Sequence, residues 1–118
     1  MTPTAVPVFV ASAPVDLRRS FDSLAAIVRD SLGRDPLGRA VYVFFNRTKE
    51  RTKILWFDGT GYCLLYKRLE RGVFRVPRDI DPDAACVSID AAELALVLQG
   101  IDLQPPRRTP PERPSLLD

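Results

Sequence analysis

The chain contains no histidine, and this absence removes much of enzyme chemistry. Ser-His-Asp and Cys-His constellations, the HExxH metalloprotease motif and proton transfer by imidazole all need that residue. Cysteine is scarce as well, because Cys63 and Cys86 are the only two and lie far apart. They lack the spacing of a zinc site and fit a reducing cytoplasm better than a disulfide scaffold. We therefore expect a cytoplasmic protein without metal or cofactor.

Long hydrophobic runs are also missing. No stretch approaches the roughly 18 apolar residues that span a bilayer, so no membrane segment is expected. The apolar stretch from Ala5 to Val10 has no Lys or Arg before it and is interrupted by Pro7, which favours a first strand over a signal peptide. The 118 residues, 46% hydrophobic and 27% charged, predict one globular domain over residues 1–103. Residues 104–118 carry five prolines and are expected to be disordered.

Two amphipathic helices are predicted from the periodicity of apolar residues. The first runs from Phe21 to Leu32, with Ser20 as N-cap and Gly33 as the stop. Its core stripe consists of Phe21, Leu24, Ala25, Val28 and Leu32. Asp90 and Glu93 have the spacing of a capping box that opens the second helix, which Gly100 closes. Its stripe consists of Leu94, Val97, Leu98 and Ile101.

Strand patterns fill the region between the helices. They cover Ala40–Phe45, Thr52–Phe57, Tyr62–Leu69 and Val73–Val76, with shorter strands expected at Val6–Ala11 and Cys86–Ile89. Connections between the successive central strands are too short for parallel crossovers, so they predict an antiparallel meander. The expected fold is α+β, an antiparallel β-meander of four to five strands with two principal helices packed on it.

The central hairpin allows a prediction of register. If the three residues from Gly59 to Gly61 form the loop with Gly61 in the left-handed conformation, Trp56 lies opposite Leu64 and Leu55 opposite Leu65. Trp56 and Leu64 are then expected to be buried neighbours. The same register places Lys53 opposite Lys67, with Arg51 on the same side, so one end of the hairpin becomes cationic.

Charge is segregated along the chain more than the net value of +2 suggests. Residues 47–78 carry nine bases and three acids, whereas residues 79–103 carry six acids and no base. One interpretation is a polarised molecule with a face for a polyanion, and the alternative is that the two segments pack together and neutralise each other. The basic residues that would contact phosphates are Arg47, Lys49, Arg51, Lys53, Lys67, Arg68, Arg71 and Arg75.

Aromatic residues are interleaved with these bases. They are Tyr42, Phe44, Phe45, Trp56, Phe57, Tyr62, Tyr66 and Phe74. A platform for stacking nucleic-acid bases is one interpretation, but aromatics in strands belong more often to the core. The carboxylates of Asp16, Asp22, Asp58 and Asp81 have no metal-ligand spacing, and Asp16 and Asp58 fit turn positions. We expect no catalytic centre.

The segment Arg51–Pro77 carries the most specific pattern, because Trp56 and the Asp58–Gly61 turn are followed by Lys67–Gly72. Further matching stretches are Val15–Phe21, Asp35–Gly38, Val43–Arg47 and Gly100–Asp102. Together they resemble the small accessory proteins (TnpB, or open reading frame 2) of the insertion-sequence-66 family of bacterial transposable elements. The resemblance implies a non-catalytic role in transposition beside a companion transposase and a second accessory protein. It leaves open direct DNA binding, an adaptor role toward the transposase, and a homodimer.

Overall fold

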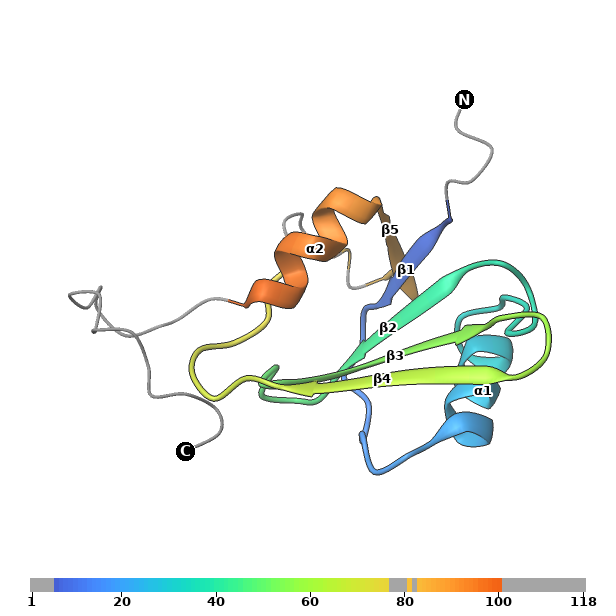
Figure 1. The fold of residues 1–118 in the computed structure, drawn as a ribbon, viewed down its shortest axis with the longest axis horizontal. Coiled ribbons are helices and arrows are strands. Elements are labelled where there is room, and N and C mark those ends of the chain that lie inside the picture. The colour runs from blue at the N-terminus through green and yellow to red at the C-terminus, as the bar shows by residue number, and fades with distance from the viewer. Residues whose placement is uncertain (1–5, 77–80, 82, 101–118) are drawn as a thin grey trace, which may run out of the picture.

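The computed structural model describes residues 6–76, 81 and 83–100. Five strands and two helices follow one another along the chain (Figure 1). They are β1 (Val8–Ala11), α1 (Phe21–Asp30), β2 (Val41–Phe45), β3 (Arg51–Phe57), β4 (Tyr62–Arg68), β5 (Cys86–Ile89) and α2 (Ala91–Gln99). The predicted α+β class is confirmed. The expected Pro-rich tail lies outside the described residues.

The strands form a single sheet in the order β4-β3-β2-β1-β5. Strands β2, β3 and β4 make the predicted antiparallel meander. Strand β1 pairs in parallel with β2 and antiparallel with β5, so the sheet is mixed. The parallel pair is reached through α1, which supplies the long crossover that a parallel connection needs.

The strand predicted at Val73–Val76 is wrong. Val73 forms an isolated bridge, and the backbone N–H of Phe74 donates to the carbonyl of Lys49 at 2.7 Å. Gly72 has a φ of 79°, a conformation that redirects the chain away from β4 before it could pair. The ring of Phe74 is buried instead, packed against Phe45 with ring centroids 5.7 Å apart. Strand β4 therefore stays at the edge of the sheet.

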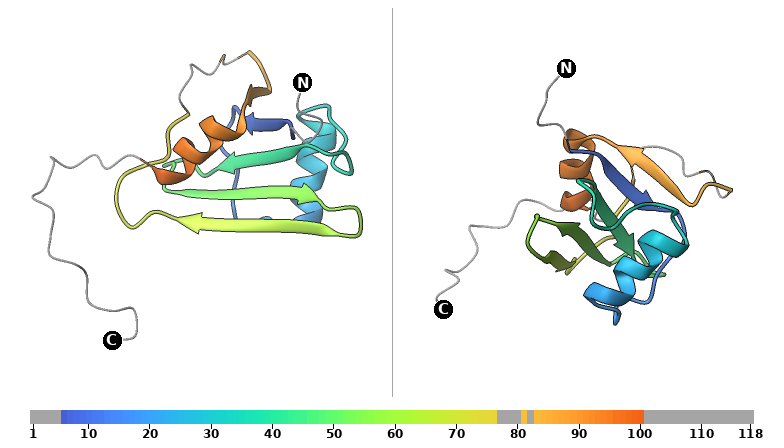
Figure 2. Two further views of the ribbon diagram at one scale, coloured as in Figure 1. Left: turned by 45° about the horizontal axis from the view of Figure 1, so that its top comes forward. Right: turned by 90° about the vertical axis from the view of Figure 1, so that its right-hand side faces the viewer.

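The helices cover opposite faces of the sheet (Figure 2). Because side chains alternate along a strand, Tyr42 and Phe44 of β2 pack with α1, whereas Val43 and Phe45 pack with α2. From α1 the core receives Leu24, Ala25 and Val28, and from α2 it receives Val97 with Leu94 and Leu98 at its border. The predicted packing of both helices on the sheet is confirmed.

The predicted stripe of α1 is wider than the observed one. Phe21 is 43% exposed, and α1 ends at Asp30, two residues before the predicted end. Beyond the helix, the N–H of Leu32 donates to the carbonyl of Ile27, and Gly33 takes a φ of 67°. Gly33 thus ends the helix as expected, since a positive φ favours glycine.

The start of α2 agrees with the prediction. The N–H of Glu93 donates to the Asp90 carboxylate at 2.7 Å, and the N–H of Asp90 donates to the Glu93 carboxylate at 3.0 Å. This is the predicted capping box. At the other end Gly100 has a φ of 76°, and a Cβ there would overlap the side chain of Leu69. The predicted stripe residue Ile101 lies outside the described residues.

The predicted register of the β3–β4 hairpin is wrong by one residue. Phe57 pairs with Tyr62, so the turn has four residues, and the positive φ belongs to Gly59 at 101°. The Asp58 carboxylate accepts the N–H groups of Thr60 and Gly61, each at 2.9 Å. These hydrogen bonds lower the pKa of Asp58 to about 2. A side-chain-stabilised turn has replaced the expected three-residue loop.

The observed register separates residues that the predicted one had brought together. Trp56 lies opposite Cys63, and Leu55 lies opposite Leu64. Trp56 packs on the α2 face and Leu64 on the α1 face, so they are not neighbours. A one-residue change in a loop moves a whole strand's side chains to the other face.

Candidate nucleic-acid interface

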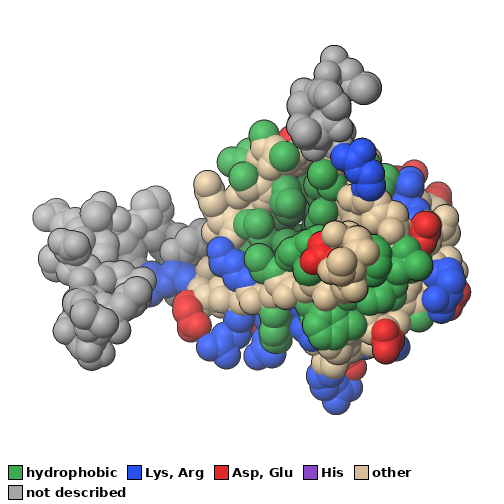
Figure 3. All heavy atoms as spheres, turned by 45° about the vertical axis from the view of Figure 1, so that its right-hand side comes forward, with side chains coloured by type: hydrophobic (Ala, Val, Ile, Leu, Met, Phe, Trp, Pro, Cys, Tyr) green, Lys and Arg blue, Asp and Glu red, His purple; other side chains and the backbone are tan. Residues whose placement is uncertain are grey.

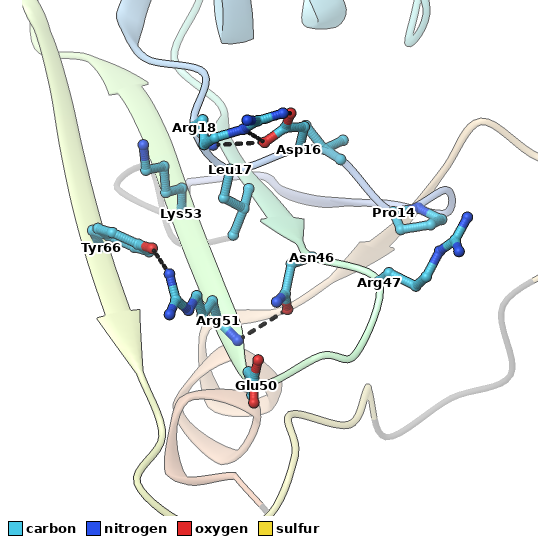
Figure 4. A pocket seen from close by; sticks show the side chains of 11 residues that line it. Pro14, Asp16, Leu17, Arg18, Asn46, Arg47, Glu50, Arg51, Lys53 and Tyr66 are labelled. Atoms are coloured by element: carbon cyan, nitrogen blue, oxygen red, sulfur yellow. Dashed lines mark hydrogen bonds and ion pairs between the residues drawn. The ribbon is translucent and has the colours of Figure 1, made fainter.

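An open cleft of about 850 Å³ lies on the α1 face, at the end of the sheet where β2 turns into β3. Strand β3 contributes Arg51 and Lys53, and β4 contributes Tyr66 (Figure 4). The opposite wall is the segment 14–18, and the β2–β3 turn closes one end with Asn46, Arg47 and Glu50. We call this feature the basic cleft, because its lining includes four bases and two acids. They are Arg18, Arg47, Arg51, Lys53, Asp16 and Glu50.

The wall of the basic cleft is fixed to the sheet by two contacts. The backbone N–H of Val15 donates to the carbonyl of Phe45 at 2.8 Å, which holds the segment against the end of β2. Leu17 is 6% exposed and packs into the α1-side core. Anchoring Leu17 leaves its neighbours Asp16 and Arg18 at the surface, where they face the cleft.

Asp16 and Arg18 form a compact pair in that wall. The Arg18 guanidinium donates to both carboxylate oxygens of Asp16, from Nε to Oδ1 at 3.0 Å and from Nη2 to Oδ2 at 2.6 Å. These hydrogen bonds, with that of the Arg18 backbone N–H, lower the pKa of Asp16 to about 2 and raise the pKa of Arg18. Both side chains are solvent-exposed, so the pair organises the wall and contributes little to stability.

Lys53 is the most buried charged residue of the candidate set, with 7% of its surface exposed. Its ammonium donates to the carbonyl of Arg19 at 2.6 Å and lies 4.8 Å from the centre of the Tyr66 ring. Neither partner carries a negative charge. Because no carboxylate among the described residues offsets the charge of its ammonium, Lys53 contributes positive potential at the floor of the basic cleft.

Arg51 lies beside Lys53 on the same face of β3. Its guanidinium donates from Nη1 to the Tyr66 hydroxyl at 3.0 Å, and its backbone N–H donates to the Asn46 side chain at 3.1 Å. Arg68 lies directly opposite Arg51 on β4 and forms an ion pair with Glu70 at 3.0 Å. Two arginines opposite each other repel, and an anion bound between them relieves that repulsion. The hairpin therefore has a cationic end on the α1 face, as expected, but Arg68 stands there in place of Lys67.

The predicted patch that combined Lys53 with Lys67 is wrong. Lys67 lies opposite Thr52, on the α2 face, and its ammonium donates to the carbonyl of Leu98 at 2.6 Å. There it neutralises the carbonyl end of α2, as a base does near a helix C-terminus. Lys67 of the basic hairpin thus contacts the acidic segment 79–103 through the backbone carbonyl of Leu98, and not through a carboxylate.

The eight candidate residues divide into three groups. Arg47, Arg51 and Lys53 line the basic cleft, and Arg68 is adjacent to it through Arg51. Lys49 lies in the β2–β3 turn with a φ of 61°, and Arg71 and Arg75 are exposed in the segment after β4. Lys67 lies on the other face. The structure adds Arg18 to the cleft. Sequence analysis missed this residue because it lies outside the basic segment 47–78. The available signal was Leu17, an apolar residue between two charged ones, which is typical of a loop anchored in the core.

The aromatic residues are mostly core. Tyr42, Phe44, Phe45 and Phe74 are buried, and Trp56, Phe57 and Tyr62 are partly buried. Tyr66, by contrast, is 51% exposed and lines the basic cleft. Within the part of the chain that the structure describes, no group of three or more His, Cys, Asp or Glu side chains could hold a metal ion.

The α2 face has a hollow of different chemistry. An open groove of about 700 Å³ runs between α2 and the β3–β4 hairpin, and we call it the apolar groove. Its apolar lining includes Val6, Leu37, Val41, Ile54, Trp56, Phe57, Leu65, Leu94 and Leu98. Val6, Leu37 and Leu65 are each at least 40% exposed. Figure 3 shows hydrophobic side chains gathered around a hollow on this side of the molecule.

Comparison with known proteins identifies the family. Residues 6–108 match the family described as IS66 Orf2 like protein. An uncharacterized protein of Sinorhizobium fredii, y4hO, is 38% identical over 104 residues, which is 88% of each chain. A second protein of that organism, y4jC, is 32% identical over 108 residues, covering 92% of this chain and 90% of the relative. No solved structure matches.

The chain therefore belongs to the IS66 Orf2-like family, which confirms the resemblance found in the sequence. Membership indicates an accessory role in insertion-sequence transposition, beside a companion transposase. In the described ranges, no helix is long and apolar enough to cross a membrane.

Proposed function

We propose that this protein is a non-catalytic accessory factor of transposition that binds the phosphate backbone of nucleic acid in the basic cleft. The observation that carries the proposal is the convergence of Arg18, Arg47, Arg51 and Lys53 on one open cleft. Arg47, Arg51 and Lys53 are close together in sequence, whereas Arg18 belongs to a distant segment that the fold brings to the same cleft. A concave surface lined by one sign of charge focuses the electrostatic potential and attracts a polyanion.

The chemistry of the lining suits phosphates more than base edges. Arginine presents a planar fork of donors that matches two phosphate oxygens, and the exposed Arg47 has that fork free of any ion pair shown in the described residues. Tyr66 offers a partly exposed ring beside the bases, where an unpaired nucleobase could stack. Backbone binding of this kind positions a protein on DNA without selecting a sequence.

The test is a salt titration of binding to a fluorescent duplex that carries the element end. For Arg47→Ala with Arg51→Ala we expect weaker binding to every duplex and a salt slope shallower by roughly two units, about one per lost phosphate contact. Arg29→Ala is a control for the loss of one exposed arginine outside the cleft, since Arg29 lies in the last turn of α1 and does not line the cleft. It should leave the slope nearly unchanged.

A change of the opposite sign sharpens the test. Glu50 lines the same cleft, so Glu50→Gln removes a negative charge without removing a side chain. We expect this variant to bind more tightly at low salt, because repulsion between Glu50 and phosphate is lost. Unchanged affinity in both cleft variants would exclude the basic cleft as the phosphate site.

A second candidate function rests on the apolar groove. A hollow lined by exposed apolar side chains is typical of a protein interaction site, which favours an adaptor that docks the companion transposase. Capture of purified transposase by the wild type and by Trp56→Ala with Leu94→Ala distinguishes the two functions. Loss of capture with unchanged DNA affinity would favour the adaptor, and loss of DNA binding in the cleft variant with intact capture would favour the phosphate site.

A further inference from the structure

Strand β4 is an edge strand of the sheet, and within residues 6–76, 81 and 83–100 no further strand pairs with its outer side. It has seven residues, pairs with β3 without a bulge, and contains no proline. Natural proteins usually protect such an edge with charges, proline, a bulge or a covering element. In β4 the charged residues Lys67 and Arg68 lie at one end, and the four residues from Cys63 to Tyr66 are uncharged. Leu65 of this edge strand also lines the apolar groove, so the free edge and the groove adjoin each other.

The free hydrogen-bonding groups of β4 belong to its even-numbered residues. The N–H of Leu69 donates to the carbonyl of Glu50, and the N–H of Asp58 donates to the carbonyl of Gly61. Because an antiparallel ladder alternates, the odd-numbered residues of β4 direct their backbone groups toward β3. Tyr62, Leu64, Tyr66 and Arg68 therefore direct theirs away from the sheet, as a template for another strand.

We propose that a second copy of this chain pairs with that edge, β4 against β4 in antiparallel orientation, with Leu65 on the two-fold axis. In this register Leu64 exchanges backbone hydrogen bonds with Tyr66 of the second copy, and Tyr62 does so with Arg68. Both pairs are even-numbered, so their free groups face each other. Leu65 is the central residue of β4, so the register also pairs the whole strand.

The distribution of charge in β4 lets a second copy pair with it in this register without repulsion. With Leu65 opposite itself, Lys67 faces Cys63 and Arg68 faces Tyr62, so no base lies opposite another base. A parallel arrangement in register would place Lys67 against Lys67 and Arg68 against Arg68, which is unfavourable. The arrangement is isologous and closes as a dimer, without leaving a further β4 edge for growth.

Apolar contacts support the pairing on the α2 face. Leu65 is 40% exposed and lines the apolar groove, so two copies of Leu65 would lie side by side and extend the apolar lining of both grooves. The two-fold axis is perpendicular to the sheet, so each face stays on its own side. The two basic cleft surfaces therefore lie on one face of a continuous sheet, next to each other across the β4 strands. The dimer forms without DNA, and its test is independent of the proposed phosphate binding.

The experiment is sedimentation equilibrium of the full chain without nucleic acid. We expect a concentration-dependent dimer for the wild type and, for Leu65→Lys, a dissociation constant at least about tenfold larger, because lysines then lie opposite each other in place of two leucines. The matched control is Leu96→Lys, since Leu96 is a 58% exposed leucine of α2, outside the β4 edge. The control should dimerise like the wild type.

A mixture of two variants tests the register itself. Leu65→Lys and Leu65→Glu should each be monomeric, and an equal mixture should form a heterodimer, because opposite charges then lie across the axis. Restored association in the mixture supports the pairing and also shows that both variants are folded. A wild type that stays monomeric, a dimer that survives Leu65→Lys, or a dimer lost in Leu96→Lys instead would each overturn it.

Discussion

The two faces of the sheet differ in how completely they are covered and in what they expose. On the α1 face, Leu24, Val28, Phe44 and Leu55 are all fully buried, and the exposed surface beside them is the basic cleft. On the α2 face, Val10, Val43 and Phe74 are buried to the same degree, but Val97 is the buried residue of the helix, and Leu94 and Leu98 border the apolar groove. Both faces therefore have a buried core, but the exposed surface beside the first core is charged, whereas among the described residues the surface beside the second is apolar.

This difference follows from the two helix sequences. Helix α1 is amphipathic, so its single apolar stripe is buried against the sheet. Helix α2, AAELALVLQ, is apolar on several sides, and Leu96 remains 58% exposed. A helix that is apolar around its circumference needs more than one partner surface. The sheet supplies one, and the chain as described leaves the others free for a partner.

The largest expected effect tests whether the two faces differ in stability. Leu24→Ala, on the α1 face, should lower the free energy of unfolding by about 2–5 kcal/mol, because a fully buried leucine leaves a cavity. Leu94→Ala is the matched change on α2 and should cost about 1 kcal/mol, since Leu94 is only partly buried. Urea denaturation of both variants measures the difference. Equal losses would show that the α2 face is as closed as the α1 face.

A smaller effect is expected from the helix cap of α2. Asp90→Ala removes the carboxylate that accepts the Glu93 N–H, and should destabilise the protein by about 1 kcal/mol. Asp90→Ser retains an acceptor and serves as the control. Because the basic cleft lies on the other face, DNA affinity of the alanine variant should equal that of the wild type. A parallel loss of DNA affinity would mean that the two faces are coupled.

The smallest expected effect is a loss of stability at low pH. Asp16 and Asp58 have pKa values near 2 in the folded protein, below the unfolded value near 4, so the folded state binds protons less readily. Their contribution is fully present above about pH 4 and is lost as the pH falls toward about 2. Thermal melts across this range should show falling stability. Asp58→Asn keeps an acceptor in the turn and should make the decline shallower, whereas an unchanged profile would contradict the assignment.

Local signals in the sequence were sufficient for most elements. The Asp90 capping box and the Gly33 stop depend on residues within a few positions of one another, and both appear in the structure. The hairpin register failed because the Asp58 side chain stabilises a four-residue turn, and one residue decides which face each side chain takes.

The candidate site could be predicted only in part, for a physical reason. Arg47, Arg51 and Lys53 were found because they are close together in sequence. Arg18 was missed because a hydrogen bond between Val15 and Phe45, thirty residues apart, brings its segment to the cleft. Such long-range contacts follow from the packing of Leu17 and the order of the strands. Neither the parallel β1–β2 pair nor this contact has a local sequence signature.

The most direct test of the account compares two variants with the same net charge, one on each face. Arg47→Ala with Arg51→Ala removes two bases from the basic cleft, and Arg39→Ala with Lys67→Ala removes two from the α2 side, where Arg39 lines the apolar groove. The measurement is the salt slope of binding to element-end DNA. The account predicts a slope shallower by roughly two units for the first variant and an unchanged slope for the second. Equal slopes for the two variants would contradict it.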